Sequence, residues 1–207
     1  MRVIEPSFTI LNNPDGFAIL QSVERIGRVC YKSEDKISKN SCRTFVSSIL
    51  KRGHESVLEH EKISVLVICD RGVSHEIVRH RTASYSQEST RYCNYTNDKF
   101  GNELTFIKPF FWEEDSAAYQ IWLGTMQTIE ESYFRLMETG ATPEEARSIL
   151  PNSLKTELVM SMNLREWRHF FRLRTSAASH PQMREIARPM LLAMKELVPI
   201  VFDDIEV

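Results

Sequence analysis

The stretch RHRTASYSQESTRY, residues 79–92, places three arginines and a histidine among hydroxyl and amide side chains. Almost none of these residues suits a hydrophobic core. The stretch follows the apolar residues Val73, Ile77 and Val78, so its charges begin where an apolar element ends. Rigid elements that end in polar loops commonly carry functional groups. A solvated surface loop is the alternative interpretation, because exposed ion pairs contribute little stability.

Helical and strand-like patterns surround this stretch. Apolar or alternating segments predict strands at 3–10, 63–70 and 154–162. Helical spacing predicts helices at 15–33, 40–53, 72–81, 114–137, 163–174 and 182–198. Pro189 is expected to kink or split the last of them, and Thr142, Pro143 and Glu145 predict a capping box that starts another helix. We expect one α+β domain over residues 1–207, with a central, mainly antiparallel sheet flanked by helices.

The composition is that of a globular protein, with 42% hydrophobic and 26% charged residues. A formal net charge of -2 does not favour a nucleic-acid or membrane partner. No apolar run approaches the roughly 20 residues of a membrane span, and Glu5 and Pro6 interrupt any signal-peptide segment. The four cysteines are far apart and form no CxxC pair, which favours a reducing compartment. We therefore expect a cytoplasmic protein.

The chain has only 7 glycines, and none of them form a dinucleotide-binding or phosphate-binding loop motif. A nucleotide would have to be held by arginine side chains, which pair bidentately with phosphate. The stretch 79–92 supplies such arginines.

The spacing of Arg79-His80-Arg81, Ser89 and Arg91 matches the signature R-H-R-x7-S-x-R of the flavin-dependent thymidylate synthases. Three further segments resemble family segments in the same order: GHESVLEH (53–60), ARSILP (146–151) and NLREWRHFFRLR (163–174). The resemblance covers roughly residues 15–200. Gln87 stands where the family motif has an acidic residue.

The resemblance implies that the chain makes thymidylate from deoxyuridylate (dUMP). Methylenetetrahydrofolate would give the carbon, reduced FAD would give the hydride, and NADPH would reduce the flavin. It also implies a homotetramer of α+β subunits whose active sites lie where subunits meet.

The resemblance assigns two sets of binding residues. The set for dUMP is Glu76, Arg79, Gln87, Glu88, Ser89, Thr90, Arg91, Arg147 and Arg174. The set for FAD is Ser56, His80, Arg81, Thr82, Gln87, Asn163, Leu164, Arg165 and His169. Asn163 is also expected to cap the helix that follows it. The roles of His54, Glu59 and His60 stay open between structure and flavin.

Arg174 is the predicted catalytic residue. Helical projection places it near the apolar side of 163–174, where an arginine is costly unless it has a partner. We interpret it as the group that stabilises negative charge on the uracil ring. The alternatives are an ion pair with Glu157 or Glu185, or a helix that has already ended by Arg174.

The opposite side of the same segment carries Arg165, Arg168, His169 and Arg172. A charged side of this kind is usually solvated. If Arg165 and His169 contact FAD, as the resemblance implies, cofactor and another subunit must cover it, which is a second reason to expect an oligomer.

Other chemistries are disfavoured. No cysteine has the proline and glutamine neighbours of the cysteine-dependent thymidylate synthases, and Ser89 lacks an adjacent base, so we interpret it as a hydrogen-bond donor. The six histidines show no metal-ligand spacing, so we expect no metal. Two alternatives remain open: an NAD(P)H flavin reductase without methyl transfer, and a nucleic-acid-binding module.

Overall fold

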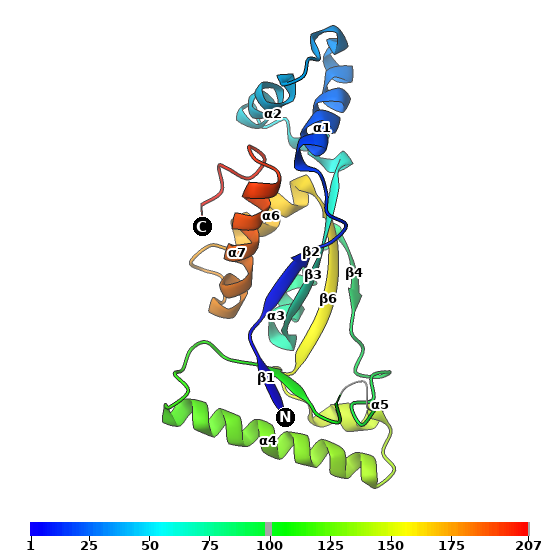
Figure 1. Cartoon of the computed structure of the whole chain (residues 1–207), viewed down its shortest axis with the longest axis vertical. Helices are drawn as coiled ribbons and strands as arrows, with labels where there is room; N and C mark the ends of the chain where they lie inside the picture. The colour runs from blue at the N-terminus through cyan, green and yellow to red at the C-terminus, as the bar shows by residue number, and fades with distance from the viewer. Residues whose placement is uncertain (98–100, 207) are drawn as a thin grey trace. The chain divides into compact units, whose positions relative to one another are not determined.

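The computed structural model describes residues 1–97 and 101–206 of the chain. These residues form two compact units, each described by itself (Figure 1). The α4 unit comprises Met1–Ser7, Val67–Arg79 and Ser86–Leu158, and the α6 unit comprises Phe8–Leu66, His80–Tyr85 and Val159–Val207. The single domain over residues 1–207 stays a prediction.

The α6 unit carries helices that pack around aromatic side chains. Its helices are α1 (Gly16–Tyr31), η1 (Glu34–Lys36), α2 (Ser41–Lys51), η2 (Glu55–His60), α6 (Leu164–Arg174) and α7 (Pro181–Leu197). Trp167 is fully buried, stacks on Phe171 with ring centroids 5.4 Å apart, and donates its indole N–H to the carbonyl of Ile63. The apolar side of α6 is therefore fixed in the core, as its sequence pattern predicts.

The α4 unit has a separate core. Its elements are β1 (Arg2–Ile4), α3 (Arg71–Ile77), β5 (Thr105–Ile107), α4 (Ala117–Glu138), α5 (Pro143–Ala146) and η4 (Arg147–Ile149). β1 pairs in parallel with β5, and Val3 lies opposite Phe106. Tyr133, Phe106 and Leu154 are buried in this core. The predicted capping box of Thr142 and Glu145 is confirmed.

A four-stranded sheet has the order β2-β3-β6-β4, and neighbouring strands run in opposite directions (Figure 1). Its strands are β2 (Ser7–Ile10), β3 (Lys62–Asp70), β6 (Lys155–Asn163) and β4 (Ala83–Gln87). The hydroxyls of Ser64 in β3 and Ser161 in β6 hydrogen-bond at 2.6 Å. The α+β class with a mainly antiparallel sheet is confirmed.

Several element boundaries differ from the sequence-based expectations. The strand predicted at 3–10 is two strands, β1 and β2, because Glu5 and Pro6 separate them. The helix predicted at 72–81 ends at Ile77, so Arg79, His80 and Arg81 follow it instead of belonging to it. The polar strand β4 was not predicted.

Pro189 does not split α7, which runs unbroken from Pro181 to Leu197. Apolar residues on both sides of the proline are buried, including Ile186 and Met190. Their packing holds the helix together although the proline lacks one backbone donor.

Among the described residues, no helix combines the length and the hydropathy that a membrane span needs.

Candidate active site

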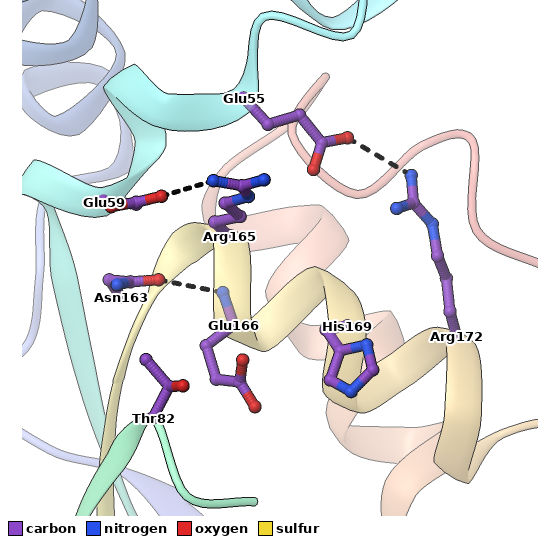
Figure 2. Close-up of a pocket in the computed structure, with 8 residues that line it drawn as sticks. All are labelled: Glu55, Glu59, Thr82, Asn163, Arg165, Glu166, His169 and Arg172. Carbon is purple, nitrogen blue, oxygen red and sulfur yellow. Dashed lines mark hydrogen bonds and ion pairs between the residues drawn. The ribbon is translucent and has the colours of Figure 1, made fainter.

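The α6 unit contains a hollow of about 500 Å³ beside the first turns of α6 (Figure 2). Its lining is polar throughout: Glu55, Glu59, Thr82, Asn163, Arg165, Glu166, His169 and Arg172. Four of these residues, Thr82, Asn163, Arg165 and His169, belong to the set predicted to bind FAD. The structure therefore brings this part of the predicted flavin set together.

The geometry of the hollow follows from the way strand β6 leads directly into α6. Asn163 ends the strand, and its side-chain oxygen accepts the backbone N–H of Glu166 at 2.8 Å, which confirms the predicted cap. With the start of the helix fixed, Arg165, His169 and Arg172 follow at helical spacing and reach the same hollow. Figure 2 shows Arg165 directed at Glu59 and Arg172 at Glu55.

The donor groups of the hollow fit part of a flavin dinucleotide. Arg165 and His169 offer N–H groups, and Thr82 offers a hydroxyl, which together suit a diphosphate. Glu59 already pairs with Arg165 and orients it. The cations of the hollow are Arg165 and Arg172, which pair with Glu59 and Glu55.

His80 is a buried polar residue with several contacts in this region. Its side chain is buried, and its Nδ1 lies 3.2 Å from a carboxylate oxygen of Glu166. Its Nε2 lies 3.0 Å from the Nε of Arg174, which donates. The ring meets Phe170 edge-on at a centroid distance of 5.0 Å, and the Tyr85 hydroxyl donates to the His80 carbonyl at 2.7 Å. The backbone carbonyl and the imidazole ring of His80 are therefore both fixed by neighbouring side chains.

Burial is the main reason why the pKa of His80 lies below its ordinary value of 6.5. The positive charge of Arg174 and the neighbouring His169 lower this pKa further, whereas the hydrogen bond and charge of Glu166 raise it. Burial also raises the pKa of Tyr85 to about 12, so its hydroxyl stays protonated and able to donate. At neutral pH the imidazole of His80 is therefore uncharged.

His80, Glu166 and His169 offer ligand atoms that lie within 4.8 Å of one another, close enough for one small cation. Two features disfavour a metal here. Both ring nitrogens of His80 already face partners, and the guanidinium of Arg174 adds a fixed positive charge. We interpret the three residues as part of a hydrogen-bond network, so the expectation of no metal stays a prediction.

One residue on the charged side of α6, Arg168, is buried within the chain itself. Arg168 is only 1% exposed and is covered by its own chain, not by another subunit. Its guanidinium bonds to Glu55 at 3.1 Å, to Asp204 at 2.6 and 2.8 Å, and to the carbonyl of Val201. Arg165, His169 and Arg172 on this side of α6 line the hollow.

The predicted dUMP set, apart from Arg174, lies in the α4 unit. Arg79, Arg91 and Arg147 are exposed, and Arg91 pairs with Glu144 at 3.1 Å. Ser89 is half-buried and accepts from the backbone N–H of Arg91, whereas Thr90 is buried.

The remaining members of this set make contacts inside the α4 unit. The amide of Gln87 donates to the hydroxyls of Ser74 at 2.9 Å and Thr156 at 3.2 Å. The carboxylate of Glu88 accepts from Tyr95 and Lys155, both at 3.0 Å, and Glu76 lies half-buried in α3. Each role toward dUMP stays a prediction.

Other members of the predicted flavin set do not line the hollow. Ser56 and Arg81 are exposed, and Gln87 belongs to the α4 unit. The Leu164 side chain is fully buried, and its N–H donates to the Glu61 carbonyl at 3.0 Å. Cofactor contacts of these residues also remain predictions.

The sequence patterns did not predict Glu55, Glu166 and Arg172 as residues of the hollow. Glu166 is the third residue after the Asn163 cap. The signal that could have found it is its spacing of three from His169, which places both on one face of a helix. Glu55 gave no such signal, because its partner Arg168 lies 113 residues away.

Known proteins match this chain over most of its length. The family model described as "Thymidylate synthase complementing protein" matches residues 18–200. A flavin-dependent thymidylate synthase of Geobacter sulfurreducens is 34% identical over 190 residues, which cover 88% of this chain and 80% of that protein. A protein of the same name from Pyrococcus horikoshii is 40% identical over 171 residues, which cover 81% of this chain and 70% of that protein.

The fold also has a close counterpart among solved structures. A UMP/dUMP methylase from Streptomyces cacaoi, crystallised with 5-Br dUMP, superimposes with a TM-score of 0.77 at 23% identity. The match covers 98% of this chain and 96% of that chain. At this identity the likeness concerns the fold.

Proposed function

Because this chain belongs to the flavin-dependent thymidylate synthase family, we propose that it forms thymidylate from dUMP. In this proposal methylenetetrahydrofolate gives the carbon, and NADPH reduces the bound FAD. The observation that carries the proposal is the family match over residues 18–200, together with the polar hollow on α6 that the predicted flavin residues line.

The residues of the chain have separate tasks in this reaction. The flavin, when bound, supplies the hydride that completes the methyl group. Arg165, His169 and Thr82 hold its diphosphate by hydrogen bonds and charge. Arg79, Arg91 and Arg147 neutralise the phosphate of dUMP, and Ser89 donates a hydrogen bond. Arg174 stabilises the negative charge that develops on the uracil ring as a carbon of that ring becomes nucleophilic.

The active enzyme is proposed to be a homotetramer with sites at the subunit interfaces. Arg165 and His169 are exposed in the single chain, although the proposal assigns them to a cofactor. A second subunit that covers the hollow would exclude water and strengthen their interactions with a diphosphate.

A spectral titration tests this function. Purified protein is expected to be yellow, and dUMP should perturb its flavin absorption until the site saturates. Deoxyuridine, which lacks the phosphate, should need at least about tenfold higher concentration, because a hydrogen bond to a charged group contributes ~1.5–3 kcal/mol. A yellow protein that ignores dUMP would favour the flavin reductase, and a colourless protein that binds oligonucleotides would favour the nucleic-acid module.

The reaction is also expected to need no cysteine. Cys42 and Cys69 are buried, and burial together with the charge of Asp70 raises the pKa of the Cys69 thiol, so the reactive thiolate is disfavoured. Replacing Cys30 and Cys93 by Ser, and the buried pair by Ala, should leave thymidylate formation within a few-fold of wild type in every variant that folds. A single folded, flavin-loaded variant without turnover would refute the prediction.

A further inference from the structure

Glu166, His80 and Arg174 form a hydrogen-bonded row of three side chains in the α6 unit. We propose that His80 is a positioning residue: held as its neutral Nδ1–H tautomer by Glu166, it accepts the Nε–H of Arg174 and orients that guanidinium. This inference rests on the proposed function, in which Arg174 acts on the uracil ring, and assigns to His80 and Glu166 a role that acts through Arg174.

The tautomer follows from the donors and acceptors around the ring. A guanidinium can only donate, so the Nε2 of His80, 3.0 Å from the Nε of Arg174, must carry a lone pair. In the neutral ring the proton then sits on Nδ1, where the carboxylate of Glu166 accepts it at 3.2 Å. This arrangement is the opposite of the Nε2–H form that predominates for free histidine in water.

The ring cannot easily turn away from this arrangement. Its side chain is 2% exposed. Phe170 and His169 pack edge-on against it, with centroid distances of 5.0 and 5.6 Å. The Tyr85 hydroxyl fixes the backbone carbonyl of His80. Holding the Nε of Arg174 against such a ring fixes the plane of the guanidinium, and with it the direction of the two terminal nitrogens.

Protonation of His80 would break the row. A charged imidazole donates from both nitrogens, so its Nε2–H would then face the N–H of Arg174. The groups that face His80 are Glu166, His169 and Arg174 of α6 and Tyr85 of β4. The net effect of burial and these neighbours is a pKa below 6.5. Thymidylate formation should therefore lose activity on an acid limb below pH 6.5, as His80 takes up its proton.

The principal test replaces Glu166 by Gln. Glu166 raises the pKa of His80, so in Glu166→Gln the acid limb of thymidylate formation should move to lower pH. The neutral amide accepts the Nδ1–H more weakly than the carboxylate does, so the ring is held less firmly and the plateau rate should fall about 10- to 100-fold, the effect of removing the partner that orients a metal-bound imidazole. The flavin absorbance of the same preparation gives the amount of bound cofactor, by which each rate is divided. An acid limb that does not move would overturn the proposal.

Glu59→Gln is the matched control. It removes a carboxylate from the same hollow, but its partner is Arg165 instead of His80. It is expected to leave the acid limb where wild type has it. If Glu59→Gln shifts the acid limb as far as Glu166→Gln does, the shift comes from removing any negative charge from the hollow. The proposed specific role of Glu166 would then be wrong.

Nitrogen-15 NMR of histidine-labelled protein gives a readout that does not depend on activity. The His80 signals, assigned by their loss in His80→Gln, should show a proton on Nδ1 and an unprotonated Nε2 at pH 8, with and without FAD. A proton on Nε2 or a charged ring would contradict the proposal even in an active enzyme. An inactive protein that shows the expected tautomer would instead refute the proposed function and leave the hydrogen-bond row standing.

Discussion

Arg174→Ala is expected to lower thymidylate formation by about 100- to 1,000-fold, the effect of losing one preorganised group that stabilises developing charge. NADPH should still bleach the flavin in this variant, because Arg165 and His169, the residues assigned to the flavin diphosphate, remain. The measurement compares the two half-reactions in one preparation: flavin reduction by absorbance, and thymidylate formation by product analysis.

Arg174→Lys is the matched comparison. Lysine keeps the charge but loses the planar guanidinium and the Nε–H that meets His80. It should therefore retain dUMP binding and lose most turnover. If Arg174→Ala forms thymidylate within a few-fold of wild type, Arg174 is a structural cation and its catalytic assignment is wrong.

Arg168→Ala is expected to destabilise the fold by ~3 kcal/mol, the lower part of the range for breaking a buried ion pair. The variant leaves Glu55 and Asp204 with only the half-exposed Arg172 as a shared cation and removes the donor to the buried Val201 carbonyl. The lower part of the range applies because Asp204 is itself about half exposed. Urea unfolding followed by circular dichroism measures the loss.

Arg172→Ala supplies an internal control, since it lies one turn further along α6 and reaches the same two carboxylates. Its side chain is 48% exposed, so its loss should cost less than about 1 kcal/mol. Equal losses in the two variants would show that burial of Arg168 does not matter.

The acid dependence of stability gives a second readout of the same cluster. The hydrogen bond from Arg168 is the main reason why the pKa of Asp204 falls from its ordinary value of 3.8 to about 2. A carboxylate with a lowered pKa stabilises the fold above its unfolded pKa, and this contribution is lost as pH falls from 3.8 toward 2. In Arg168→Ala that acid-dependent loss should be much smaller.

Local signals in the sequence predicted a large part of this fold. The Asn163 cap, the capping box at Thr142 and the apolar stripe of α6 depend on residues within a few positions of one another, and the structure confirms all three. The signature in residues 79–92 predicted the family, and the match of the family model to residues 18–200 confirms it. These features could be predicted because helix caps and amphipathic spacing are short-range properties.

The missed features depend on residues that are distant in sequence. The contact between His80 and Glu166 spans 86 positions, and that between Arg168 and Glu55 spans 113. Without these partners Arg168 looks like a solvated cation, and Glu166 looks like a helix-start residue. Strand β4 was missed because residues such as Ser84 and Gln87 carry no apolar alternation, so its pairing in the sheet decides its structure.

The cluster around Arg168 also sets an order of events during biosynthesis. Arg168 belongs to a helix that the ribosome completes at Arg174, but its partners Val201 and Asp204 are made later. Until residues 201–204 have emerged, burying this arginine would leave its charge only partly compensated. The nascent α6 unit is therefore expected to stay incompletely packed while the chain grows and to close after those residues leave the ribosome, a stage at which domains are exposed to chaperones.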